Sequence, residues 1–224
     1  MRFSAASDQT ILVYLGEEIS RECQQRVVRL LRLLQQGPLP WVRNLQPAYC
    51  SLLVQFDSCA VDHAEVEAAL RDCELRAEAI PIPEPRMVEI PVCYGGIYGP
   101  DLEDVAAAHE LMPAQVMEFH SAQTYQAYFL GFAPGFAYLG DVPPEIATPR
   151  LVTPRKKVPA GSVGIAGRQT GVYPFATPGG WRLIGRTPLP MFRADREPMN
   201  LVSLGDAVRF RPITQDEFTQ LEPR

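Results

Sequence analysis

The sequence PIPEP at residues 81–85 divides this chain of 224 residues into two parts with different patterns. Proline stands at every second position of this stretch. A proline cannot donate a hydrogen bond to a β-sheet, and it holds the backbone extended. The stretch therefore predicts a stiff linker over residues 81–86, which separates a first domain, residues 1–80, from a second domain, residues 87–224.

The first domain alternates between strand and helix patterns. Apolar residues recur at three- and four-residue steps from Ile19 to Leu34, which predicts an amphipathic helix. Asp62 and Glu65 have the spacing of a capping box, which opens a second helix. The expected elements, in chain order, are a strand at 10–15, a helix at 19–34, strands at 42–46 and 51–56, a helix at 62–73 and a short strand at 78–80. This order is βαββαβ, the ferredoxin-like pattern of an α+β domain.

The second domain is expected to consist mainly of turns and short strands. Met87–Tyr94 alternates as a strand, and Pro100 and Pro113 each stand where the first residue of a short helix would lie. From Tyr125 onward, short apolar runs are broken by glycine and proline, and a strand at 207–212 precedes a brief terminal helix. These features predict a β-barrel or a β-sandwich.

The charge and hydropathy of the chain exclude several classes of protein. The sequence has 26 acidic and 21 basic side chains and a net charge of −5, whereas nucleic-acid-binding proteins usually carry a basic surface. No uninterrupted apolar run approaches the roughly 18 residues that a membrane-spanning helix needs. Residues 1–10 also lack the pattern of a signal peptide. We therefore expect a soluble cytoplasmic protein that binds neither nucleic acid nor a membrane.

The cysteines and histidines do not form a recognisable disulfide or metal motif. The five cysteines are widely spaced and include no CxxC pair, and three histidines are too few for a His-rich metal centre. We expect the cysteines to be reduced and mostly buried. We also expect no metal site and no tightly bound cofactor.

Three blocks of the second domain combine glycines, aromatic residues and cations: FLGFAPGFAYLG (129–140), PRKKVPAGSVGIAG (154–167) and YPFATPGGWRLIGRTP (173–188). Glycine lets the backbone approach a ligand closely, aromatic rings offer stacking faces, and Arg and Lys bind carboxylate or phosphate. The same composition is also typical of barrel corners and tight turns. Two interpretations therefore stay open, a ligand site or a set of structural turns.

These blocks, together with YGGIYGPDLEDVA (94–106) and HSAQTYQAYFLGF (120–132), resemble the family of 5-oxoprolinase B subunits. This family is also named for the kinase inhibitor KipI and for allophanate hydrolase subunit 1. The resemblance implies an N-terminal α+β domain followed by a cyclophilin-like β-barrel. It also implies two partners, a homologous cyclophilin-like C subunit and an A subunit. With these partners, the family opens 5-oxo-L-proline to L-glutamate at the expense of ATP.

The reaction implied by this resemblance restricts the residue types that its site needs. A five-membered lactam resists hydrolysis, and phosphorylation of its amide oxygen makes a better electrophile for water. Such a site needs cations around the phosphoryl oxygens, a base for the water and, in the assembled complex, ATP with Mg²⁺. The chain has no G-x-x-x-x-G-K-[ST] loop, so any contact with the nucleotide is not of the P-loop kind.

His120, Arg155 and Lys157 are the candidate catalytic residues. His120 is the only histidine beside a block, and two roles are open for it: a catalytic base, or a helix-end residue that bonds a carbonyl. Arg155 and Lys157 suit an anion better than a core, because buried unpaired cations are costly. Lys157 stands where the family pattern has Arg, so it lacks the bidentate fork. The candidate residues for binding substrate or nucleotide are Phe132, Pro134, Gly135, Phe136, Gly161, Gln169, Tyr173, Gly179 and Arg186.

The leading hypothesis for function is a subunit of ATP-dependent 5-oxoprolinase that is active only with its partners. One alternative is a KipI-like inhibitor of a sporulation-type histidine kinase. Another is a component of an allophanate hydrolase or a urea carboxylase. The chain is too short for a full carboxylase and lacks the Met-Lys-Met motif of a biotin carrier.

Overall fold

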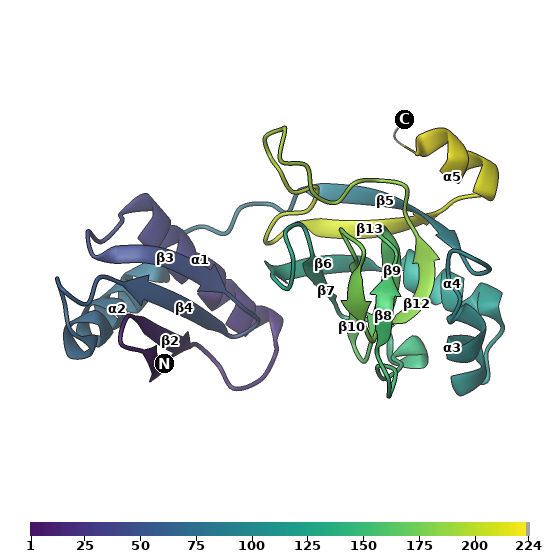
Figure 1. Ribbon diagram of the computed structural model, residues 1–224. Helices are drawn as coiled ribbons and strands as arrows, with labels where there is room; N and C mark the ends of the chain where they lie inside the picture. The colour runs from purple at the N-terminus through teal and green to yellow at the C-terminus, as the bar shows by residue number, and fades with distance from the viewer. Residues whose placement is uncertain (223–224) are drawn as a thin grey trace. The chain divides into compact units, whose positions relative to one another are not determined.

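The structure, a computed structural model, describes residues 1–222 and divides the chain into two compact units (Figure 1). The first unit is Met1–Glu84, and the second begins at Pro85. Residues 81–86 lie at this boundary as an exposed segment without helix or strand. Each unit has a hydrophobic core of its own.

The first unit packs helices against a four-stranded sheet. Its elements are β1 (Arg2–Ser7), β2 (Thr10–Tyr14), α1 (Arg21–Gln36), β3 (Val42–Pro47), β4 (Ser51–Phe56) and α2 (His63–Ala77). The strand order in the sheet is β1-β2-β4-β3, and all neighbouring strands are antiparallel. Because α1 connects β2 to β3 and β4 lies between these two strands, the unit contains a split βαβ motif. The buried side chains of the sheet alternate along its two central strands: Ile11, Val13, Leu52, Val54 and Phe56.

Local sequence signals set the starts of both helices in this unit. Ser20 caps α1, and its hydroxyl accepts a hydrogen bond from the backbone N–H of Cys23 at 3.1 Å. The predicted capping box of Asp62 and Glu65 is confirmed at the start of α2. Ile19, which the apolar pattern assigned to the first helix, precedes α1 and is exposed, so the prediction was wrong at that residue.

The mixed helix and strand character of the first unit is confirmed, but the predicted βαββαβ order is wrong at both ends. Residues 78–80, expected as a strand, form a turn in which the N–H of Ile80 bonds the carbonyl of Ala77 at 3.0 Å. Three residues are too few for periodicity to separate a strand from the end of a helix. The additional strand β1 lies at the sheet edge beside β2, and its mostly exposed residues lack an apolar alternation. The observed order is ββαββα.

Seven strands of the second unit close into a barrel, which confirms the predicted barrel over the sandwich. The strand order is β10-β7-β6-β13-β5-β12-β9, and β9 pairs with β10 to complete the ring. Two further strands, β8 and β11, form a separate small sheet. The elements of the unit are β5 (Met87–Tyr94), α3 (Leu102–Ala108), α4 (Pro113–Ala122), β6 (Thr124–Leu130), β7 (Ala137–Gly140), the 3₁₀ helix η1 (Pro144–Ile146), β8 (Arg155–Val158), β9 (Ser162–Ala166), β10 (Gln169–Val172), β11 (Thr177–Gly179), β12 (Arg182–Arg186), β13 (Ala207–Pro212) and α5 (Gln215–Leu221).

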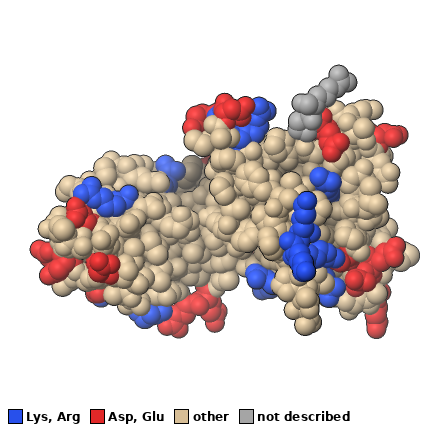
Figure 2. Space-filling model, viewed as in Figure 1, with Lys and Arg blue, Asp and Glu red and all other residues tan. Residues whose placement is uncertain are grey.

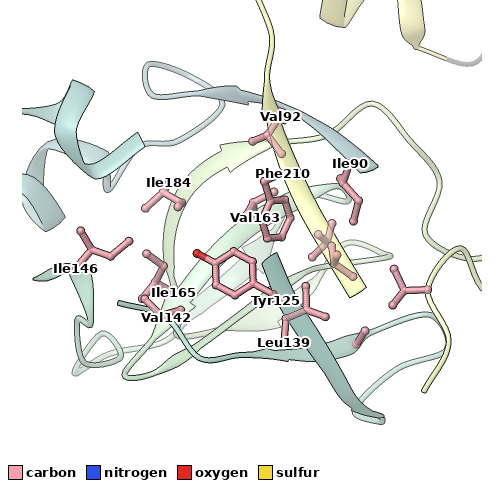
Figure 3. Close-up of a cluster of buried hydrophobic side chains, with 14 of the residues drawn as sticks. Ile90, Val92, Tyr125, Leu139, Val142, Ile146, Val163, Ile165, Ile184 and Phe210 are labelled. Carbon is pink, nitrogen blue, oxygen red and sulfur yellow. The ribbon is translucent and has the colours of Figure 1, made fainter. Parts of the chain in front are cut away.

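The barrel encloses a core of aliphatic and aromatic side chains (Figure 3). Tyr125 and Phe210 lie within it, with ring centroids 5.6 Å apart. Ile90, Val163 and Ile184, from three different strands, point toward these rings and are fully buried. The interior is therefore a packed core, as expected for a barrel of few strands. This leaves the loops and the small β8–β11 sheet as the places where a ligand site is most accessible.

Candidate functional site

Five aromatic side chains from two of the sequence blocks meet beside the barrel, and we call them the aromatic cluster: Phe132, Phe136, Tyr138, Tyr173 and Trp181. The ring of Phe136 contacts the other four edge to face, at centroid distances between 4.9 and 5.5 Å. Val158 and Ala166, from the remaining block, pack against the same cluster. The structure therefore brings residues of all three blocks together, although they are far apart in the sequence.

Phe132 is the exposed member of the aromatic cluster. Its side chain is 61% exposed, and its φ of +69° lies in the left-handed region that a bulky residue rarely adopts. Pro134, in the same loop, is also exposed, whereas Phe136 and Tyr173 are buried. Strained backbone of this kind is concentrated at ligand and contact sites. Phe132 and Pro134 are thus the two predicted binding residues of this loop that an incoming group can reach.

The predicted glycines are required by contacts within the protein itself. A Cβ on Gly179 would lie 2.5 Å from the Tyr173 hydroxyl oxygen, and one on Gly135 would lie 2.7 Å from the Cβ of Phe192. A Cβ on Gly161 would lie 2.3 Å from the carbonyl oxygen of Thr187. These close approaches favour the structural-turn interpretation for the three glycines.

Arg155 is held in place by a buried carboxylate. Its Nη2 donates to Asp101 Oδ1 at 2.6 Å, and Asp101 Oδ2 accepts the backbone N–H of Leu183, also at 2.6 Å. The Asp101 side chain is only 5% exposed and that of Arg155 29%. The other terminal nitrogen of Arg155, Nη1, is buried without a hydrogen-bond partner among residues 1–222. Asp101 therefore joins the start of α3 to β8 and β12.

The other predicted cations have different surroundings. Lys157 and its neighbour Lys156 are exposed on β8. Figure 2 shows Lys and Arg side chains gathered over the part of the second unit where β8 lies. Arg186, at the end of β12, donates from Nε to the carbonyl of Ala160 at 2.8 Å, and its guanidinium lies 6.0 Å from the centroid of the Phe218 ring. Arg155 and Lys157 thus share one strand, whereas Arg186 is tied to other groups.

Gln169 lies at a turn of the barrel. It begins β10 and pairs with Ala166 across the tight connection from β9. Its partly exposed side chain lies at this corner. The position fits the structural alternative, a residue that supports a loop backbone.

His120 lies inside the barrel rather than at its surface. Its ring is fully buried and stacks on Phe210 with centroids 4.5 Å apart. The Thr170 hydroxyl donates to the carbonyl of Gly164 at 3.0 Å, so it accepts from His120 Nε2 at 2.9 Å. His120 Nδ1 then accepts from the Tyr94 hydroxyl at 2.8 Å. Both ring nitrogens are occupied, which does not support the predicted role as a catalytic base and identifies a structural residue of the core.

Burial lowers the pKa of His120 from its usual value of 6.5 to about 3. We therefore expect the second unit to lose stability as the pH falls below 6.5, because the unfolded ring binds a proton that the folded ring does not. Between pH 7 and pH 5 the expected loss is about 2 kcal/mol. Urea unfolding curves at the two pH values measure it.

Two variants test the origin of this pH dependence. His120→Gln keeps hydrogen-bonding groups but cannot titrate, so the pH dependence should shrink. His109→Gln is the control, because the His109 side chain hydrogen-bonds Thr148 at 3.0 Å and is only partly buried. If the free energy of unfolding of His120→Gln depends on pH as steeply as that of the unmodified chain, other groups cause the pH dependence.

Residues 1–202 match the family model described as "Carboxyltransferase domain, subdomain C and D". The chain belongs to this family. One relative is a protein from Bacillus subtilis (strain 168) that is named as the B subunit of 5-oxoprolinase. It is 43% identical to this chain over 222 residues, and the aligned region covers 94% of this chain and 92% of the Bacillus protein. The protein of the same name from Escherichia coli O157:H7 is 44% identical over 210 residues, covering 92% and 93%. The resemblance seen in the sequence is thus confirmed.

A solved structure has a similar fold over most of this chain. The crystal structure of TTHA0988 has a TM-score of 0.81 and 34% sequence identity to this carboxyltransferase-domain chain. The match covers 93% of this chain but 40% of TTHA0988. This chain therefore spans less than half the length of that protein.

Asp101 is the residue of this carboxyltransferase-domain chain that the sequence-based prediction missed. It lies in the block YGGIYGPDLEDVA, close to the start of an expected helix. A negative charge is favourable at that position, so the sequence offered no reason to look for another role. Its two partners are 54 and 82 positions away in the sequence, so no local spacing pointed to them.

No group of three or more His, Cys, Asp and Glu side chains that could hold a metal ion is found in residues 1–222. The same residues contain no helix long and apolar enough to cross a membrane.

Proposed function

We propose that this chain is the B subunit of an ATP-dependent 5-oxoprolinase, which opens 5-oxo-L-proline to L-glutamate, and that it acts in the cytoplasm with a C and an A subunit. The observation that carries the proposal is the identity of 43% and 44% to two proteins named as B subunits of 5-oxoprolinase, over more than nine-tenths of each chain. These names do not favour the two alternatives, a histidine-kinase inhibitor and an allophanate hydrolase or urea carboxylase component.

The second unit offers fixed positive charge for the anions of this reaction. 5-Oxoproline carries a carboxylate, and ATP carries a triphosphate. Asp101 holds Arg155 in position at the start of β8, and Lys156 and Lys157 follow it on the same strand with exposed side chains. Cations placed in advance stabilise transferring phosphoryl groups and carboxylates. We therefore assign anion binding in the assembled enzyme to β8.

Other groups of the reaction are proposed to come from the partner subunits. His120 is sealed in the barrel core, so it is a poor source of the base that activates water. Residues 1–222 bring together no cluster of three or more candidate ligands for a metal ion. We assign no metal-dependent step to the described residues.

Reconstitution tests this proposal. The purified chain alone is expected to show neither glutamate formation nor 5-oxoproline-dependent ATP hydrolysis, because it supplies only part of the site. Addition of its cognate C and A subunits should produce both activities. ADP release, with and without 5-oxoproline, and glutamate formation are the measurements.

Within the reconstituted complex, Lys157→Ala is expected to lower turnover about 10-fold or more without preventing assembly. Arg168→Ala is the matched control, since Arg168 is another exposed cation, near Asp141 in a turn, and its loss should leave turnover unchanged. Coupled ATP hydrolysis by the chain alone would contradict the subunit role. Failure to bind the C subunit, together with tight binding to a histidine kinase, would support the inhibitor instead.

A further inference from the structure

Two of the free cysteines lie side by side in the first unit. Cys23 is in the first turn of α1, and Cys50 is in the turn between β3 and β4. Their thiols are close enough to interact, because the neighbouring Cys50 thiol is among the causes that raise the pKa of Cys23. Although 26 residues separate them in the sequence, the fold brings the two sulfur atoms together.

Both thiols pack against the same short segment, Gly16–Glu18. Cys50 Sγ donates to the carbonyl of Glu18 at 2.9 Å. A Cβ on Gly16 would lie 2.5 Å from Cys23 Sγ, so glycine leaves the space that the Cys23 thiol occupies. The backbone is tied at the same place, because the N–H of Leu15 bonds the carbonyl of Cys50 at 2.8 Å. The pair is thus held by several independent contacts.

The two thiols differ in access to solvent. Cys50 is partly exposed, whereas Cys23 is 5% exposed. Burial, and after it the neighbouring Cys50 thiol, raises the pKa of Cys23 to about 12. A dissolved oxidant therefore meets Cys50 first. A partly exposed thiol beside a second, buried cysteine can form a sulfenic acid that the second cysteine resolves.

We propose that a peroxide oxidises Cys50 and that Cys23 resolves the product to a reversible intramolecular disulfide. In the first step the Cys50 sulfur attacks the peroxide O–O bond, which gives a sulfenic acid and one water. In the second step the Cys23 sulfur attacks the sulfenic sulfur, the S–S bond forms, and the hydroxyl leaves with the Cys23 proton as a second water. Two thiols are oxidised and one hydrogen peroxide is reduced to two waters. The disulfide ties the first turn of α1 to the β3–β4 turn.

Peptide mapping of the oxidised full chain tests the proposal. Trypsin cleaves after Arg21, Arg26, Arg43 and Arg71, so Cys23 has a peptide of its own, whereas Cys50 and Cys59 share one. The experiment therefore uses a Cys59→Ser chain, treated with hydrogen peroxide, alkylated and digested without reduction. We expect one linked pair of peptides, lighter than the sum of the free peptides by about 2 Da and separated by dithiothreitol.

Matched variants assign the bond. Cys59 is exposed and serves as the control thiol, so Cys59→Ser should keep the intramolecular link. Cys23→Ser should lose it and leave Cys50 to oxidise further to the sulfinic acid, whereas Cys50→Ser should leave Cys23 as a free thiol. The mapping of Cys59→Ser needs neither of these variants to fold. Cys50 oxidised to sulfinic acid beside an alkylated Cys23, or a link from Cys23 to another cysteine, would overturn the proposal.

Discussion

Replacement of Asp101 by alanine is expected to lower the free energy of unfolding of the second unit by about 3–5 kcal/mol. The buried carboxylate holds both the Arg155 guanidinium and the backbone N–H of Leu183. Its removal leaves a mostly buried cation without its counter-charge and a buried N–H without an acceptor. Urea unfolding followed by Trp181 fluorescence, in a Trp41→Phe background, reports on the second unit alone.

Asp104→Ala is the matched control for this experiment. Asp104 lies in α3, the helix that Asp101 precedes, but its carboxylate is 69% exposed and 3.6 Å from Arg182. An exposed pair of this kind contributes at most about 1 kcal/mol. If the two variants lose the same small amount of stability, the Asp101 contacts do not hold the barrel together.

The second large effect is expected for Gly161→Ala, which should destabilise the second unit by about 3 kcal/mol or more. The φ of Gly161 is +79°, and an added Cβ would lie 2.3 Å from the carbonyl oxygen of Thr187. The backbone of Gly161 cannot move away easily, because its N–H bonds Tyr173 and its carbonyl accepts from Thr187. The same urea unfolding assay measures the loss.

Gly167→Ala separates the steric contact from the backbone conformation. Gly167 also has a positive φ, +58°, but its added Cβ would have no atom within 4 Å. The expected loss is therefore only about 1 kcal/mol, the cost of the left-handed conformation. A Gly161→Ala chain with normal stability but reduced turnover in the complex would instead support the ligand-binding role considered for this glycine.

Residue types alone predicted where the candidate site lies, but not which of its side chains are exposed. Phe136, Tyr173 and Gly179 were predicted as binding residues on composition, and the structure places all three in or against the aromatic cluster, where they pack on one another. Phe132 has the same residue type as Phe136 but lies exposed at its edge. Composition therefore located the region of the site. The exposure of each side chain distinguishes a packing residue from a contact residue, and it depends on how the loops fold over each other.

The sequence by itself determined the features whose causes lie within a few residues or within one element. The Asp62–Glu65 capping box, the apolar stripe of α1 and the short strands of the barrel follow from local hydrogen bonds and periodicity, and the sequence blocks identified the family. Only the tertiary structure decided that His120 is enclosed and that Asp101 binds Arg155. The tertiary structure also places Cys23 beside Cys50. Each of these contacts joins residues of different elements, so it depends on strand pairing and packing, which no local pattern of residues specifies.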